Sequence, residues 1–240
     1  MRIMIELQNV SKKFGKKKVL SNLNCQLEKG VYGLLGPNGT GKTTLMRCIT
    51  NLYQDWSGDI RIEGKSIRKR NSQTIGYLPQ NFGMFHELSV EETLQYMCNL
   101  KRISKKYRKD EIERCLQLVY LESEKRTQIK KLSGGMLRRV GIAQSLLGNP
   151  DILLFDEPTA GLDPEERVHF KEILLQLGKR ETVLISTHII EDVEATCSSI
   201  IIMKNGTIQT IGTCEEIKEA AGKSKLKPTL EDGYLAIIRS

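Results

Sequence analysis

The sequence predicts an α/β fold with a mainly parallel sheet, an N-terminal antiparallel β subdomain and an inserted α-helical subdomain. Apolar runs of strand length alternate with helical segments, which is typical of a parallel sheet. Residues 2–10 and 19–28 flank Gly15 as the two strands of an antiparallel hairpin would. From Ser89 to about Leu147 the pattern is wholly helical, so we expect a helical block inserted in the α/β core.

The strands of the parallel sheet are predicted from short apolar runs bounded by turn residues. These runs cover residues 31–35, 74–78, 152–155, 182–186 and 199–203. A helix from about Lys42 to Leu52 follows the first run. Asn205-Gly206 predicts a hairpin turn between the last strand and residues 207–211.

Three helix starts carry capping residues. Ser89-Val90-Glu91-Glu92 has the spacing of a capping box and opens the helical block. Ser133 is placed to cap the last helix of the block. Asp163 followed by Pro164 predicts another helix start, with aspartate at the N-cap and proline at the first helical position.

The composition is that of an ordinary globular protein. Of 240 residues, 39% are hydrophobic and 28% are charged, which argues against disorder. No apolar run approaches the roughly 20 residues of a membrane-spanning helix, and the start lacks a signal peptide's apolar stretch. The six cysteines are scattered, so we expect neither a disulfide framework nor a zinc site, and a reducing cytoplasm is the simplest setting.

The net charge of +8 raises the question of an anionic partner. The basic residues gather around the Gly15 turn (Lys12, Lys13, Lys16, Lys17 and Lys18) and between residues 101 and 109. We interpret both groups as solvated faces. Contact with acidic phospholipid headgroups is the alternative, and no nucleic-acid partner is expected.

A phosphate-binding loop is predicted between the first parallel strand and the helix after it. The segment fits G-x-x-x-x-G-K-[ST] and consists of Gly36, Pro37, Asn38, Gly39, Thr40, Gly41, Lys42, Thr43 and Thr44. Glycines let successive N–H groups point at phosphate oxygens beside a helix N-terminus. Lys42 would supply positive charge to the β- and γ-phosphates, and Thr43 a hydroxyl ligand to Mg²⁺.

Two carboxylates follow the buried strand of residues 152–155. Asp156 and Glu157 emerge at its carboxyl end, where open α/β sheets bind ligands. Asp156 is placed to hold Mg²⁺, directly or through water. Glu157 is placed to orient and deprotonate an attacking water. An acidic turn after a core strand is the alternative, which the phosphate loop makes less favourable.

A third motif, Leu132-Ser133-Gly134-Gly135-Met136, completes a pattern. The phosphate loop, then Leu-Pro-Gln ending at Gln80, then this motif, then the Asp-Glu strand resembles the ATP-binding subunits of ABC transporters over roughly residues 2–215. The resemblance implies a P-loop NTPase core that binds ATP. It also implies that Ser133, Gly134 and Gly135 open a helix pointing at the γ-phosphate of ATP held by a second subunit. Met136 departs from the family's usual glutamine.

The resemblance implies roles for four further residues. Gln80 matches the glutamine that senses Mg²⁺ and water and relays the nucleotide state to the membrane partner. His188 matches the histidine that contacts the γ-phosphate. Asp163 ends Ala160-Gly161-Leu162-Asp163, which is similar to the family's dimer-contact loop. Phe14 matches the aromatic that stacks on adenine, with a core phenylalanine as the alternative.

The expected organisation is a single domain over residues 1–240. It comprises an ATP-binding core of about 1–80 and 150–215, a helical subdomain of about 81–149 and a short C-terminal extension of 216–240. Two copies would dimerise around two ATP, because one chain carries each motif once. We expect a homodimer on the inner face of the cell membrane that drives a separate integral-membrane permease.

The resemblance is greatest to bacterial exporter subunits for drugs or antimicrobial peptides, on residues 132–140 and 158–164 and the ending 230–235. The alternative is a soluble ABC-type ATPase acting on ribosomes or DNA, but those usually carry two cassettes or long coiled coils. A non-hydrolytic binding module is a third class, which Glu157 and His188 argue against. The segment 81–86, with two aromatics and a methionine after Gln80, is expected to dock on the permease through Phe85, with a core Phe85 as the alternative.

Overall fold

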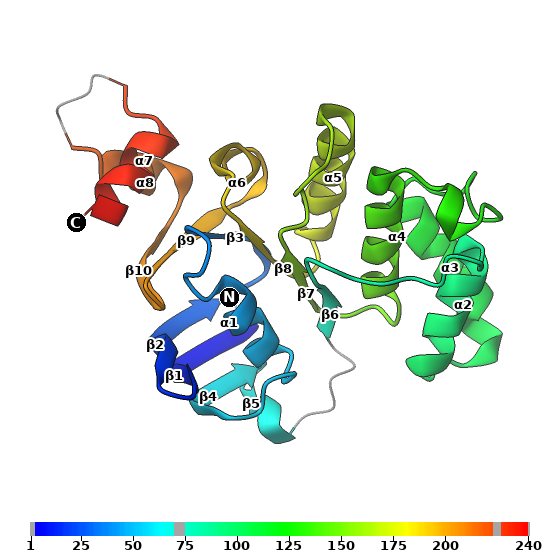
Figure 1. The fold of residues 1–240 in the computed structure, drawn as a ribbon, viewed down its shortest axis with the longest axis horizontal. Helices are drawn as coiled ribbons and strands as arrows, with labels where there is room; N and C mark the ends of the chain where they lie inside the picture. Colours follow the sequence, from blue (N-terminus) through cyan, green and yellow to red (C-terminus); the bar gives the residue numbers. More distant parts are fainter. Residues whose placement is uncertain (1–2, 70–74, 223–226, 240) are drawn as a thin grey trace.

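A computed structural model describes residues 3–69, 75–222 and 227–239. Arg2 and Thr74, where two predicted strands would begin, lie outside the described residues, as do 223–226 and 240 of the predicted C-terminal extension. The described chain has the predicted α/β architecture, with an antiparallel sheet, a mostly parallel sheet and helices on both sides of the latter (Figure 1).

The N-terminal sheet is antiparallel, with strand order β2-β1-β4-β5. Its strands are β1 (Ile5–Phe14), β2 (Lys17–Leu27), β4 (Trp56–Ile62) and β5 (Lys65–Ser66). The predicted turn at Gly15 is confirmed, since Phe14 pairs with Lys17 and Gly15 has a φ of 56°. Both hairpin strands extend further towards this turn than the sequence indicated, and β4 and β5 were not predicted.

The second sheet has the strand order β10-β9-β3-β8-β7-β6 and is parallel except for β10. Its strands are β3 (Gly30–Leu35), β6 (Ile75–Leu78), β7 (Ile152–Asp156), β8 (Thr182–Thr187), β9 (Ser199–Lys204) and β10 (Thr207–Gly212). The predicted runs coincide with these strands to within a few residues. Asn205 and Gly206 both have positive φ, as a two-residue hairpin turn requires.

The helices are α1 (Lys42–Ile49), α2 (Val90–Leu100), α3 (Lys105–Leu118), α4 (Gly134–Leu146), α5 (Pro164–Leu177), α6 (Ile190–Thr196), α7 (Cys214–Glu219) and α8 (Leu230–Arg239). All three predicted caps are confirmed: the side chains of Ser89, Ser133 and Asp163 each accept a hydrogen bond from a first-turn N–H. The block from Ser89 to Leu147 is not wholly helical, because residues 119–133 form turns and a 3-10 helix at Ile129–Lys131. None of the helices in the described ranges has the length and apolarity needed to span a membrane.

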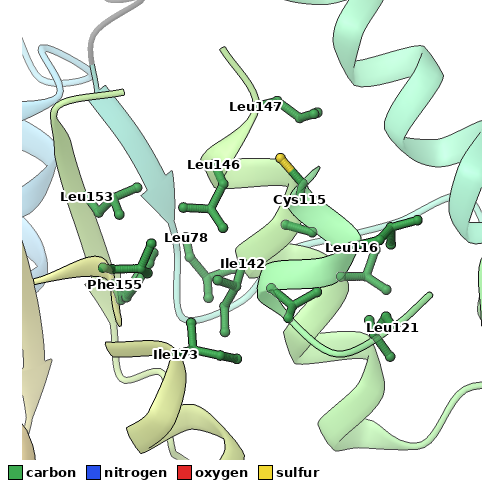
Figure 2. Close-up of a cluster of buried hydrophobic side chains, with 14 of the residues drawn as sticks. Leu78, Cys115, Leu116, Leu121, Ile142, Leu146, Leu147, Leu153, Phe155 and Ile173 are labelled. Atoms are coloured by element: carbon green, nitrogen blue, oxygen red, sulfur yellow. The ribbon is translucent and has the colours of Figure 1, made fainter. Parts of the chain in front are cut away.

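The parallel sheet separates two hydrophobic cores. Because side chains alternate along a strand, Ile152 and Leu154 of β7 face α1 and the antiparallel sheet, whereas Leu153 and Phe155 face the helical block. Figure 2 shows the second of these cores, where residues of α3 and α4 meet β6 and β7. Each such buried side chain contributes about 1.5–3 kcal/mol. The helical block therefore packs on β7, the strand that ends at Asp156 and is followed by Glu157.

The C-terminal helices cover the β9–β10 end of the parallel sheet, on the same face as the helical block. Ile217 of α7 and Leu230 of α8 pack against Leu35, Ile200 and Ile202. In Figure 1 this helix pair lies beside β9 and β10, at the opposite end of the molecule from α2 and α3. The C-terminal extension therefore packs on the sheet through a separate, small hydrophobic core.

Candidate nucleotide-binding site

Four functional segments meet because of the strand order. The phosphate loop follows β3, His188 follows β8, Asp156 ends β7 and Gln80 follows β6, and these are four neighbouring parallel strands. The carboxyl ends of parallel strands lie at one edge of the sheet, where α/β proteins bind ligands. Segments more than a hundred residues apart in the sequence thus form one site.

The phosphate loop has two positions that only glycine tolerates. Gly41, just before α1, has a φ of 103°, and a Cβ there would lie 2.7 Å from Leu20 Cδ2. A Cβ on Gly36 would lie 2.4 Å from the carbonyl oxygen of Met203. The loop therefore curls tightly between β9 and β2, and the N-terminus of α1 faces the space above it.

Lys42 is buried at the centre of this loop. Its Nζ donates to the carbonyl oxygens of Gly36 at 2.6 Å and Pro37 at 3.2 Å, and lies 3.7 Å from Glu157 Oε1. Burial lowers the pKa of Lys42, an effect that the nearby carboxylates of Glu157 and Asp156 oppose. The geometry keeps a cation beside the loop, in reach of an anionic ligand.

Asp156 joins the phosphate loop to β8. Its Oδ1 accepts hydrogen bonds from Thr43 Oγ1 at 3.1 Å and Ser186 Oγ at 2.5 Å. Its Oδ2 is buried and has no hydrogen-bond partner among the described residues. A buried oxygen without a partner is costly, whereas a carboxylate and a hydroxyl side by side are the hard oxygen donors that Mg²⁺ prefers. The donor set therefore fits Mg²⁺.

Glu157 is held in an unusual backbone conformation. It is buried and has a φ of 48°, which for a residue with a side chain costs about 1–3 kcal/mol. Its N–H donates to Ser186 O at 3.1 Å and Ser186 Oγ at 3.0 Å, so β8 helps to fix this conformation. The carboxylate Oε2 lies 2.9 Å from Nδ1 of the exposed His188. The structure thus brings together Lys42, Glu157 and His188.

A cavity of about 730 Å³ opens over these groups. It is lined by predicted site residues (Asn38, Gly39, Gly41, Lys42, Thr43, Thr44, Gln80 and Glu157) and by five others (Lys17, Lys18, Val19, Asn205 and Gly206). The five were missed because Lys17, Lys18 and Val19 begin strand β2 and Asn205 and Gly206 form the β9–β10 turn, and neither segment carries a nucleotide-binding motif. Ser21 N donates to Gly206 O at 2.8 Å, which brings the β9–β10 turn against β2 and so to the edge of the cavity.

The residues of the third motif and Asp163 lie apart from this cavity. Ser133, Gly135 and Asp163 do not line this cavity, and Gly134 lines a second one of about 260 Å³ together with Gln80, Ala160 and Gly161. Ser133 Oγ accepts from Met136 N at 3.1 Å, as a helix cap. Within one chain, therefore, the Ser-Gly-Gly segment does not line the cavity of the phosphate loop, although Gln80 borders both cavities.

Phe14 lies on the surface and not in the core, with 43% of its area exposed. Its ring packs edge-on against Tyr53, with centroids 5.3 Å apart, and Lys12 Nζ lies 4.4 Å from its centroid. The interpretation of Lys12 as part of a solvated face is wrong, since Lys12 is almost fully buried and pairs with Asp55. The residues around Lys12 in β1 are mostly polar or charged, so the sequence did not predict that Lys12 is buried.

Comparisons with known proteins agree on one family. The family model described as ABC transporter matches residues 20–160. The linearmycin resistance ATP-binding protein LnrL of Bacillus subtilis (strain 168) is 33% identical over 246 aligned residues, covering 99% of this chain and 79% of LnrL. The aliphatic sulfonates import ATP-binding protein SsuB of Bacillus cereus is 38% identical, covering 86% of this chain and 84% of SsuB.

A solved structure of the ATP-binding subunit of an ABC transporter superposes with a TM-score of 0.84 at 25% identity, covering 98% of this chain and 99% of that one. A P-loop core with an inserted helical block and a carboxylate pair after β7 defines an ATP-hydrolysing domain. The chain belongs to the ABC transporter family. It is an ATP-binding subunit of such a transporter and an ATPase, and subunits of this kind work with membrane permease partners. Relatives of similar identity are named for export and for import, so the family covers both directions.

Proposed function

We propose that Glu157 is the general base of ATP hydrolysis in this subunit. The observation that carries the proposal is the position of its carboxylate, buried beside the phosphate loop, 3.7 Å from Lys42 Nζ and 2.9 Å from His188 Nδ1. Glu157 takes the proton of a water whose oxygen attacks the γ-phosphorus. The bond to the bridging oxygen breaks, and ADP leaves with the electron pair.

Other residues bind and orient the nucleotide in this proposal. Lys42 and the N–H groups of residues 36–44 bind the β- and γ-phosphates, and His188 contacts the γ-phosphate. Phe14 offers its exposed ring to adenine. Thr43, Asp156 and Gln80 hold Mg²⁺, whose charge neutralises the phosphate oxygens when it is bound.

The active unit in this proposal is a dimer around two ATP. Ser133, Gly134 and Gly135 lie outside the phosphate cavity of their own chain, which leaves their N–H groups and hydroxyl for ATP held by a second copy. The N-terminus of α4 adds positive partial charge there. Asp163 and its loop would contact the second copy. Hydrolysis then removes the ligand that joins the two chains.

The permease is proposed to dock on the helical side of the molecule. In the segment 81–86, Phe82 and Met84 pack against the helical core, whereas Phe85 is 56% exposed and meets Tyr96 edge-on at 5.2 Å. Leu100 lies one turn after Tyr96 and is also exposed. Together with the exposed Leu52, it lines a cavity of about 680 Å³ between the ends of α2 and α1. An apolar face of this kind suits an amphipathic cytoplasmic helix of the permease.

Export is the proposed direction, with the subunit at the cytoplasmic face of the cell membrane. It is supported by the resistance protein LnrL, whose alignment covers 99% of this chain. The test expresses the chain with the membrane protein encoded beside it. Uptake of candidate drugs into inside-out vesicles, dependent on ATP, is the result expected of an exporter; uptake into right-side-out vesicles would reverse the direction.

Docking is tested by Phe85→Ala. We expect basal ATPase activity of the isolated subunit to stay within about twofold, because Phe85 touches no phosphate-site group, while co-purification with the permease falls. Tyr107→Ala is the matched control, an aromatic of similar exposure (58%) on α3 outside the docking face. Unchanged co-purification of Phe85→Ala, or an equal loss in both variants, would remove Phe85 from the interface.

A further inference from the structure

Arg138 connects two separate main-chain segments of the site, the loop after β6 and the loop after β7. It lies in the second turn of α4 and is 8% exposed. Its Nη1 donates to Gln80 O at 2.9 Å, its Nε to Pro158 O at 2.8 Å, and its Nη2 to Glu157 O. All three donor nitrogens of one guanidinium are therefore used on carbonyl oxygens of the loops that follow β6 and β7.

Burial of the Arg138 guanidinium costs stability, because a buried charge loses its hydration. Its hydrogen-bond acceptors among the described residues are neutral carbonyls, and the ring of Phe82 lies 5.6 Å from its Cζ. Burial lowers the pKa of Arg138, and only the more distant charges of Asp156 and Glu157 oppose this. A planar fork with several fixed donors can bind several carbonyl oxygens at once, which a lysine cannot match.

The contact with Glu157 bears on its strained backbone. Ser186 on β8 binds the Glu157 N–H, and Arg138 on α4 binds its carbonyl oxygen. A residue in the left-handed region stays there only when its surroundings fix it. These contacts hold the main chain on both sides of the Glu157 side chain, from two different elements.

We propose that Arg138 is a positioning residue that fixes Glu157 and Gln80 jointly for hydrolysis. Its guanidinium sets the peptide planes around Glu157 and the start of the Gln80 loop against one rigid helix, α4. That helix begins directly after Ser133, so the surface proposed to meet a second copy and the carboxylate of the same chain move as one unit. The inference rests on the roles proposed above for Glu157 and Gln80.

The neighbouring Arg139 provides a matched control. It is equally buried, at 8% exposed, but its guanidinium donates to Val119 O at 3.2 Å and Tyr120 O at 2.9 Å and pairs with Glu166 at 3.0 Å. None of these groups touches the phosphate site. Replacing either arginine removes a buried charge from α4, and only one of the two replacements releases Glu157.

The experiment compares Arg138→Met, Arg138→Lys and Arg139→Met in the full chain, with kcat, KM, affinity for a fluorescent ATP analogue and Tm measured for each. For Arg138→Met we expect kcat to fall about 10- to 100-fold, the effect of a misplaced reacting group, with KM and nucleotide affinity within about threefold. Arg138→Lys should recover part of the loss. Arg139→Met should lower Tm and leave kcat of the folded protein within about threefold.

A second comparison separates this inference from the proposed base. In a Glu157→Gln background, Arg138→Met should lower turnover no further, because both changes act on one group. If Glu157→Gln alone keeps its turnover, the assignment of the base fails, independently of Arg138. The positioning role is overturned if folded Arg138→Met keeps kcat within about twofold, or if Arg139→Met loses as much. Should Arg138→Met not fold, an undiminished kcat of Arg138→Lys overturns it as well.

Discussion

The substitution Glu157→Gln isolates the proposed base with little change in shape. An amide replaces the carboxylate, so the side chain keeps its volume in a buried position while losing its proton affinity. Removal of a general base lowers turnover by about 10²–10⁴-fold. At about 1.36 kcal/mol per factor of ten, this raises the barrier by about 2.7–5.4 kcal/mol.

The affinity for ATP, in contrast to turnover, should not fall in Glu157→Gln. Oε1 of Glu157 lies 3.7 Å from Lys42 Nζ, and the pair stands where the γ-phosphate is proposed to bind. Removing the negative charge lessens repulsion of the phosphates and frees Lys42 to pair with them. We therefore expect affinity for ATP that is equal to or higher than that of the wild type, and an ATP-bound dimer that persists because hydrolysis no longer opens it.

The assays are phosphate release, titration with a fluorescent ATP analogue, and size-exclusion chromatography with ATP and Mg²⁺. Glu181→Gln is the matched control, since Glu181 is a half-buried glutamate that lines a different cavity. Turnover of Glu157→Gln within about threefold of the wild type would refute its role as base. Loss of nucleotide binding would show that the carboxylate acts in binding instead.

Further predictions concern binding, the shared site and pH. Lys42→Ala should weaken nucleotide binding at least tenfold, because it removes the buried cation at the loop, and titration with the fluorescent analogue measures this. Mixing Lys42→Ala chains with Ser133→Arg chains puts both lesions in one site of a heterodimer; ATPase activity above either mutant alone supports a shared site, and none with heterodimers present contradicts it. Burial raises the pKa of Glu181, so its ionisation destabilises the fold above its unfolded pKa of about 4.3. Glu181→Gln should therefore raise Tm at neutral pH, with a gain that shrinks as pH falls towards that value; a gain constant with pH would contradict the reasoning.

The sequence was most informative where the chemistry is local. The loop of residues 36–44 and the Asp156-Glu157 pair are short segments that can be recognised from consecutive residues alone. Strand and helix positions in the parallel sheet followed in the same way, because strands buried on both faces are continuous apolar runs. Capping at Ser89, Ser133 and Asp163 was predicted from a few neighbouring residues and is present.

Other elements carried no local signal. Strand β4 contains Ser57, Gly58 and Asp59, which look like turn residues, and it forms because Gly58 fits against the Gln8 and Asn9 carbonyls of β1 where the register shifts. The helical block is interrupted between α3 and α4 by turns anchored through hydrogen bonds from Val90 and Ile129. In both places a distant partner overrides local propensity.

The sequence by itself determined the class of protein, the phosphate loop and the pair of carboxylates, because each is encoded in consecutive residues. Only the tertiary structure placed Ser186 on both Asp156 and Glu157, Lys17 and Lys18 at the cavity, and Arg138 across the two loops after β6 and β7. These contacts depend on strand order and on helix α4 lying against the end of β7. Hydrogen bonds between residues far apart in the chain leave no periodicity and no motif, so they exist only once the sheet and its helices have packed.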